Sequence, residues 1–263
     1  MDTTANETSG TCVLTSIDAG VATVTLNRPS QMNALSLDML DALRTSLDAI
    51  ALDRAVRVVV MAANGRVFCP GHDLKKLLAH RTREFVAGVF KAYSDIMLLI
   101  TRMPQPVIAK VHATATAAGC QLVASCDLAV ASTNARFATS GINFGLFCAT
   151  PGVAVSRAVA RKHALEMLLT GEFIDAATAR ERGLVNRVVA PDELDAAVAR
   201  LAAVLADKPP AVLAAGKKFF YEQVELNTSS AYELATEVIT NNMLGPEAAE
   251  GASAFAAKRK PNW

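Results

Sequence analysis

The chain has 263 residues, of which 52% are hydrophobic and 19% are charged. This is the composition of a globular protein, and the length suits one large domain or one domain with an extension. The formal net charge is only +1. Nucleic acids and anionic membrane surfaces attract dense basic patches, so neither is expected as a partner.

The cysteines and the first residues bear on the cellular location. None of the five cysteines forms a CxxC pair, and an odd number argues against a closed disulfide framework. Residues 1–10 lack the basic and apolar regions of a secretory signal peptide. The apolar runs are also shorter than the roughly 20 residues that span a bilayer. We therefore expect a cytoplasmic protein with buried reduced thiols, no membrane insertion and no metal site.

The N-terminal half alternates strand and helix patterns. Two β-rich runs joined by an Asp-Ala-Gly turn predict a hairpin, Val13 to Ile17 and Val21 to Leu26. Apolar residues at helical spacing after Ser36, a plausible N-cap, predict a helix over Leu37 to Leu52. Further along, we expect a helix closed by Pro104 and several short apolar strands buried on both faces. The helix is Glu84 to Met103, and the strands are Arg57 to Ala63, Pro106 to Val111 and Asp127 to Ala131.

The pattern changes near residue 190. The alternation from about residue 56 onward predicts an α/β fold with a largely parallel sheet. After about residue 190 no further strand pattern is found, and only helical patterns follow. These patterns cover Asp192 to Ala206, Pro210 to Val224, Ala231 to Met243 and Pro246 to Lys258. The predicted organisation is an α/β core over residues 1–190 and a C-terminal helical segment over residues 191–263.

Two segments place small residues where a strand ends. The first is Phe68-Cys69-Pro70-Gly71-His72-Asp73-Leu74, and the second is Ala117-Ala118-Gly119, which leads into a helix. Small residues let a ligand approach the backbone, and a helix N-terminus offers free N–H groups that can stabilise an oxyanion. A glycine after a strand is more often only a turn, and an alanine-rich helix start is more often only close packing. These residues alone leave both interpretations open.

Several motifs follow one another in a fixed order along the chain. They are Asn27-Arg28-Pro29 with Asn33-Ala34-Leu35, then Phe68-x-x-Gly71-x-Asp73-Leu74, Pro106-Val107-Ile108-Ala109, Gly119-Cys120-x-Leu122, Cys126-Asp127, Leu169-Thr170-Gly171-Glu172 and Glu250-Gly251. In order and spacing they resemble the enoyl-CoA hydratase/isomerase (crotonase) superfamily over nearly the whole chain. Within that family, residues 71–74 and 143–148 resemble the branch of enoyl-CoA hydratase domain-containing protein 3.

The resemblance implies both a fold and a substrate. The fold would be the crotonase fold, an α/β arrangement of repeated ββα units whose C-terminal helices build a homotrimer or a hexamer. The partner would be an acyl-CoA thioester of fatty-acid metabolism, so coenzyme A would be part of the substrate and no separate cofactor is expected. Backbone N–H groups of His72 and Ala118 would form the oxyanion hole. Residues near the CoA would be Arg28, Ala34, Asp73, Leu74 and Gly119, with Lys258 from a neighbouring subunit's tail or, alternatively, Lys258 as a solvated charge.

The chain departs from the family at two positions. The family's catalytic glutamates fall on Gln121, which cannot titrate, and on Gly141, which has no side chain. A missing positioned acid or base typically costs about 10²–10⁴ in rate. The loop from Gly145 to Pro151 is also expected to be longer than usual. The remaining local candidates for proton transfer are His72, His112, Ser140, Asn143 and Cys148, with His72 the best placed.

Two hypotheses for the function follow. The first is an enzyme, nominally an enoyl-CoA hydratase/isomerase, that keeps the oxyanion hole but has weak or altered catalysis. The second is a non-catalytic acyl-CoA binder or a regulatory interaction partner. A carboxylate, imidazole or thiol beside the reacting carbons would favour the first hypothesis.

Overall fold

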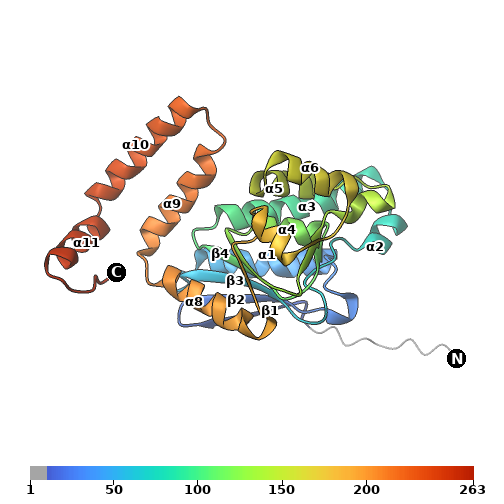
Figure 1. The fold of residues 1–263 in the computed structure, drawn as a ribbon, viewed down its shortest axis with the longest axis horizontal. Helices are drawn as coiled ribbons and strands as arrows, with labels where there is room; N and C mark the ends of the chain where they lie inside the picture. Colours follow the sequence, from blue (N-terminus) through green and yellow to red (C-terminus); the bar gives the residue numbers. More distant parts are fainter. Residues whose placement is uncertain (1–10) are drawn as a thin grey trace.

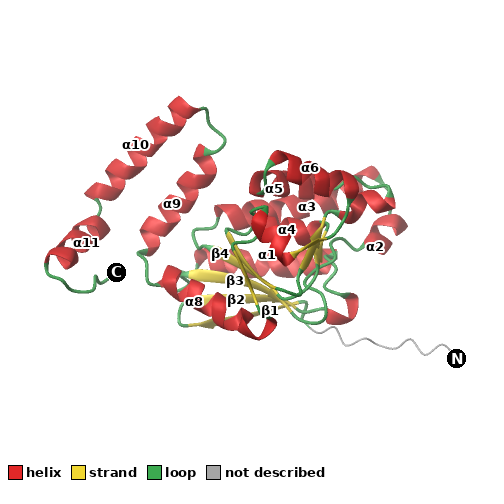
Figure 2. Cartoon of the chain, viewed as in Figure 1, coloured by secondary structure: helices red, strands yellow, loops and turns green. Residues whose placement is uncertain are grey.

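The computed structural model describes residues 11–263, and Figures 1 and 2 show the arrangement of its elements. The predicted hairpin is confirmed: β1 (Val13–Asp18) pairs antiparallel with β2 (Val21–Leu26). Ala19 and Gly20 join the strands with φ of 47° and 78°. A two-residue turn with two positive φ angles has a backbone twist that matches the right-handed twist of the flanking strands.

Two sheets organise the core. The larger has six strands in the order β1-β2-β3-β4-β6-β9, parallel from β2 onward. The smaller has the order β5-β7-β8. The remaining strands are β3 (Val58–Ala63), β4 (Val107–Val111), β5 (Ala115–Thr116), β6 (Leu128–Ser132), β7 (Arg136–Ala138), β8 (Ile174–Asp175) and β9 (Arg187–Val189). The strands expected from the apolar runs are therefore present and form a largely parallel sheet.

The helices also follow the expected order. The predicted Ser36 cap is confirmed, since its Oγ accepts from the N–H of Met39 at 3.3 Å. The α-helices are α1 (Leu37–Leu52), α2 (Leu74–Ala79), α3 (Arg83–Arg102), α4 (Ala118–Ser125), α5 (Ala149–Ala158), α6 (Arg161–Thr170), α7 (Ala176–Glu181), α8 (Leu194–Ala206), α9 (Pro210–Gln223), α10 (Thr228–Leu244) and α11 (Pro246–Ala256). The short 3₁₀ turns are η1 (Pro29–Gln31), η2 (Ser140–Phe144) and η3 (Pro191–Glu193). Successive pairs of strands followed by a helix, such as β1-β2-α1 and β4-β5-α4, repeat along the core.

Both faces of the large sheet are covered. One face packs on α1, α3 and α4, and the other packs on α8 through Val58, Ile108, Leu194 and Val198. This double burial explains why the strands are continuously apolar and do not alternate with polar residues. The segment after residue 190 is helical as predicted, but its first helix, α8, packs on the large sheet and is part of the core. Figure 1 shows α9, α10 and α11 extending away from the sheet. Within residues 11–263 no helix is both long and apolar enough to span a bilayer.

A buried ion pair ties α9 to the core. Lys217 Nζ lies 2.7 Å from Asp127 Oδ2, and the two side chains are only 7% and 15% exposed. The same ammonium group donates to the carbonyl oxygens of Ile100 and Gln105, both at 2.8 Å. Asp127 also accepts from the N–H of Val107 at 2.7 Å. Burial lowers the pKa of Lys217, and the Asp127 carboxylate opposes that shift. This network joins α9 to the end of α3 and the start of β4.

Removing the ammonium group should destabilise the protein. In Lys217→Met the carboxylate of Asp127 keeps its neutral donors but loses its counter-charge, and a buried charge without its partner costs about 3 kcal/mol or more. Chemical denaturation should show this loss in the free energy of unfolding. The neighbouring Lys218 is 74% exposed, so Lys218→Met should change that free energy by less than about 0.5 kcal/mol. Equal effects of the two substitutions would contradict the assigned role of Lys217.

Candidate active site

The two expected oxyanion donors lie next to each other. Gly71 has φ +103°, and a Cβ built on it would stand 3.0 Å from the backbone nitrogen of Ala118. The peptide that joins Gly71 to His72 therefore passes directly beside the start of α4. Neither the N–H of His72 nor that of Ala118 donates to a protein acceptor in the part of the chain that the structure describes. Two amides without a protein acceptor thus lie close together.

A second close contact fixes this arrangement. A Cβ on Gly119 would stand only 2.1 Å from the carbonyl oxygen of Cys69, so any larger residue would push α4 away. Ala117, just before the helix, has φ 50° and ψ −118°, a conformation that alanine rarely adopts. Its N–H donates to the carbonyl of Ala138 at 2.9 Å. Strained backbone of this kind persists where the surroundings hold it and is concentrated at functional sites.

A buried amide connects the loops beneath the site. Asn33 is fully buried, and its Oδ1 accepts from the N–H of Arg28 at 2.9 Å. Its Nδ2 donates to the carbonyl oxygens of Asn64 and Phe68, at 2.8 and 3.2 Å. The sequence motif contained Asn33, but its spacing alone gave no reason to assign this role. The side chain holds the loop of Arg28 against the segment that leads to Gly71.

The residues expected near CoA belong to several different elements of the fold. The Arg28 guanidinium donates to Ser36 Oγ at 3.1 Å and lies 3.6 Å from Asp38. Asp73 caps α2 by accepting from the N–H of Lys76 at 3.2 Å, and Leu74 opens that helix. Ala34 precedes Leu35, whose N–H donates to the carbonyl of Gly71 at 2.8 Å, and Gly119 lies in the first turn of α4 next to Ala118. Lys258 is exposed and follows shortly after α11, and Figure 1 shows α11 at the opposite end of the molecule from α2. A single chain therefore does not bring Lys258 to the other predicted residues.

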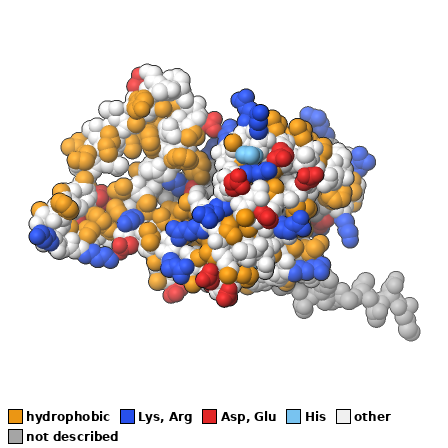
Figure 3. Space-filling view, in the orientation of Figure 1, with side chains coloured by type: hydrophobic (Ala, Val, Ile, Leu, Met, Phe, Trp, Pro, Cys, Tyr) orange, Lys and Arg blue, Asp and Glu red, His pale blue; other side chains and the backbone are white. Residues whose placement is uncertain are grey.

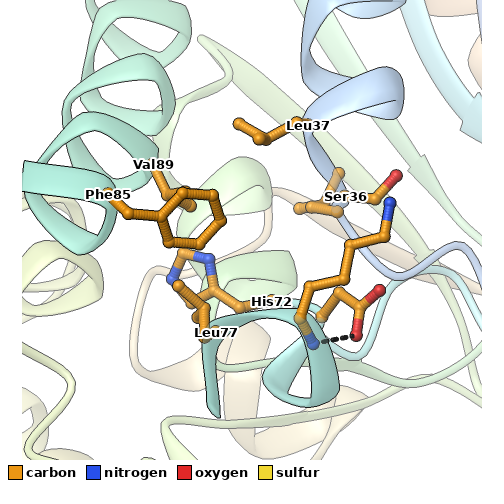
Figure 4. Close-up of a pocket in the computed structure, with 9 residues that line it drawn as sticks. Ser36, Leu37, His72, Leu77, Phe85 and Val89 are labelled. Atoms are coloured by element: carbon orange, nitrogen blue, oxygen red, sulfur yellow. Dashed lines mark hydrogen bonds between the residues drawn. The ribbon is translucent and has the colours of Figure 1, made fainter. Parts of the chain in front are cut away.

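The His72 side chain lines a small pocket that is mostly apolar but is also bordered by Ser36, Asp73 and Lys76. Its ring packs edge-on against Phe90 and Tyr93, with centroids 4.8 and 4.3 Å apart. Burial lowers its pKa to about 4, so the imidazole is neutral at pH 7 and is a weak base. The adjoining pocket has a volume of about 20 Å³, room for about one water molecule. Figure 4 shows its apolar wall, which includes Leu37, Leu77, Phe85 and Val89.

The positions expected to have lost glutamates differ in their surroundings. Gln121 is 3% exposed, and its Oε1 has no hydrogen-bond partner among the described residues. A Cβ on Gly141 would stand 2.6 Å from the carbonyl oxygen of Leu146 and 2.7 Å from Cys148 Sγ. The Gly141 N–H also donates to that sulfur at 3.3 Å. The loop before α5 therefore fills the space that any side chain at position 141 would need.

The other candidates for proton transfer are engaged in structural contacts. His112 Nε2 lies 2.8 Å from the carbonyl oxygen of Gly65, as expected for a packed histidine. The hydroxyl of Ser140 lies 2.8 Å from that of Thr116, and Asn143 donates to the carbonyl of Gly171 at 3.4 Å. Burial raises the pKa of the Cys148 thiol. In residues 11–263 no group of three or more His, Cys, Asp or Glu is arranged to hold a metal ion.

Comparison with known proteins decides the family. A family model described as "Enoyl-CoA hydratase/isomerase" matches residues 16–263. The chain belongs to this family. An enoyl-CoA hydratase structure from Mycobacterium smegmatis is 54% identical with a TM-score of 0.94, over 96% of this chain and 98% of that one. The crystal structure of human enoyl-CoA hydratase domain-containing protein 3 is 44% identical with a TM-score of 0.93, over 96% and 100%. These matches confirm the predicted crotonase fold.

The curated relatives confirm the predicted branch and correct the predicted location. The enoyl-CoA hydratase domain-containing protein 3 of Xenopus laevis is 46% identical over 244 residues, 93% of this chain and 83% of that protein. The Xenopus laevis protein and its human counterpart are both named as mitochondrial. The prediction of a cytoplasmic location is therefore wrong. It failed because a missing secretory pattern argues only against secretion and does not distinguish the remaining compartments.

Proposed function

We propose that this family member binds acyl-CoA thioesters of fatty-acid metabolism and polarises the thioester carbonyl between the N–H groups of His72 and Ala118. The close approach of Gly71 to the Ala118 nitrogen supports this most directly. Donors that converge on one oxygen stabilise the negative charge of an enolate or a tetrahedral intermediate. One such donor is worth about 3–4 kcal/mol of barrier.

We further propose that hydration by this protein is weak or altered. Gln121 occupies the position of one family glutamate, and its amide can orient water but cannot accept a proton. Gly141 occupies the position of the other, where the carbonyl of Leu146 and the thiol of Cys148 leave no room for a carboxylate. The neutral imidazole of His72 is a weak base at pH 7. The site therefore offers carbonyl polarisation without an efficient partner for proton transfer.

The filled space at Gly141 also favours an alternative function. A protein with an oxyanion hole and no acid–base group can bind a thioester without converting it. Such a protein would act as an acyl-CoA binder or as a regulatory interaction partner. In both cases we expect Arg28, Ala34, Asp73, Leu74 and Gly119 to contact the CoA moiety, as the resemblance to the family implies.

The proposed assembly is a homotrimer or a hexamer. Apart from the largely buried side chain of Lys217, α9 and α10 have few side chains shielded from solvent in the single chain, and Leu244 and Phe255 are 83% and 87% exposed. Figure 3 shows apolar side chains over this part of the surface. Packing against a second copy would cover them and would carry Lys258 toward a neighbour's site. Sedimentation at micromolar concentration should give a trimer or hexamer, and a monomer would rule this assembly out.

Substitution of Gly71 tests the proposed oxyanion hole. A Cβ at Gly71 would press against the Ala118 nitrogen, so Gly71→Ala should weaken the binding of crotonyl-CoA at least about tenfold. Isothermal titration calorimetry measures this affinity. Gly183→Ala is the matched control, because Gly183 also has a positive φ, +87°, but its nearest neighbour is the carbonyl of Ala158 at 3.4 Å. Equal affinities in the two variants would refute the hole, and no binding by the wild type would refute the proposed function.

A further inference from the structure

Three basic residues follow one another shortly after α11, and two of them are bound to carboxylates. Arg259 pairs with Glu250 of α11, with Nη1–Oε1 and Nη2–Oε2 distances of 2.6 and 2.8 Å. Lys260 Nζ lies 2.7 Å from Oδ1 of Asp207, which follows α8. Lys258, the first of the three, is exposed and makes no ion pair among residues 11–263. The motif residue Glu250 therefore has a partner, while the lysine beside that partner is free.

Lys258 also has an unusual backbone conformation. Its φ is +50°, in the left-handed region that glycine adopts far more readily than residues with a side chain. The N–H of Lys258 donates to the carbonyl of Phe255 at 3.1 Å, and that of Arg259 donates to the carbonyl of Ala254 at 3.0 Å. These two bonds form a Schellman motif, in which glycine is the usual residue at the left-handed position. A lysine therefore stands where the helix end favours glycine.

The residues after Lys258 are held against α11 and the end of α8. The N–H of Asn262 donates to Glu250 Oε1 at 2.8 Å, so one carboxylate binds both this residue and Arg259. The indole Nε1 of Trp263 donates to the carbonyl of Asp207 at 2.9 Å. Figure 1 shows the chain turning back after α11 toward α8. Strained backbone persists where the surrounding contacts hold it, and here Glu250 fixes the chain that leaves the turn.

We propose that Glu250 and Arg259 are positioning residues that hold Lys258 in this conformation, so that its ammonium group reaches the phosphates of CoA bound to a neighbouring subunit. This inference rests on the proposed function and the proposed assembly. The resemblance to the family implies only that a basic residue of the tail approaches the nucleotide. The role of the ion pair follows from the contacts just described. A lysine side chain is long and flexible, so a fixed backbone limits the freedom that it loses on binding and raises the affinity.

A purely structural role of the ion pair is the competing explanation. Such a pair would stabilise the end of α11 without any effect on the nucleotide. Two probes distinguish the explanations: crotonyl-CoA and crotonyl-pantetheine have the same acyl and pantetheine groups, but only crotonyl-CoA carries the nucleotide phosphates. A positioning role affects the binding of crotonyl-CoA alone. A structural role changes the thermal transition and either leaves both affinities unchanged or weakens both alike.

Titration calorimetry with the two probes tests the proposal. Lys258→Gly removes the ammonium group and puts glycine at the left-handed position, so the helix end is retained. It should weaken crotonyl-CoA binding about tenfold, the effect of one hydrogen bond to a charged group, and leave crotonyl-pantetheine binding unchanged. Glu250→Gln releases Arg259 but keeps Lys258, so crotonyl-CoA binding should weaken about threefold. Glu247→Gln, at an acidic residue of the same helix without an ion pair in the described part of the chain, should match the wild type.

The double variant shows whether Glu250 acts through Lys258. If it does, Glu250→Gln combined with Lys258→Gly should bind crotonyl-CoA about tenfold more weakly than the wild type, as Lys258→Gly does alone. Independent effects would multiply to a loss of about thirtyfold and would overturn the positioning role. Wild-type affinity in Glu250→Gln, an equal loss with crotonyl-pantetheine, or dissociation of that variant to monomers in sedimentation would also overturn it.

The outcomes separate this inference from the proposed function. If the wild type binds crotonyl-CoA and Lys258→Gly binds it equally well, the role of the tail is refuted and the thioester site stands. A wild type that binds neither probe would refute the proposed function itself.

Discussion

The first turn of α4 lies directly against the backbone of residues 69–71, with no side chain between them. Gly119 and Gly71 make this contact possible, because a Cβ at either position would collide with Cys69 O or approach the Ala118 nitrogen to 3.0 Å. The contact orients α4 and carries the peptide of His72 to the helix start. The closeness of the two free amides and the position of Gln121 on α4 follow from it.

In the function that we propose, polarisation of a carbonyl and transfer of a proton depend on different parts of the chain. Backbone donors depend on the path of the main chain, so they tolerate changes of side chain, such as alanine at position 118. Acid–base groups depend on the side chains themselves, and Gln121 and Gly141, at the positions where we expect the family's glutamates, cannot titrate. The loop through Leu146 and Cys148 fills the space at Gly141, so a single substitution there cannot restore a carboxylate without moving the loop.

Local patterns in the sequence predicted most of the fold. The hairpin, the Ser36 cap and the doubly buried strands each follow from a short stretch of residues, and the C-terminal helices follow from periodicity. Residues distant in the sequence determine the features that were missed. Asp127 is part of a sequence motif, but its ion pair with Lys217 depends on how α9 returns to the core. The packing of the His72 ring depends on Phe90 and Tyr93 from α3. The filled space at Gly141 is more local, since Cys148 is seven residues away, but it depends on how the intervening loop folds back. Spacing along the chain does not encode these contacts.

The central claim is that the carbonyl-polarising half of the site is intact while the proton-transferring half is missing. Hydration of crotonyl-CoA by the wild type at saturating substrate, followed by loss of the enoyl-thioester absorbance, tests it most directly. We expect saturable binding with a turnover at least about a hundredfold below the typical enzyme value of roughly 10 s⁻¹. A turnover close to about 10 s⁻¹ would contradict the account and would require an efficient base among the residues assigned here to structure.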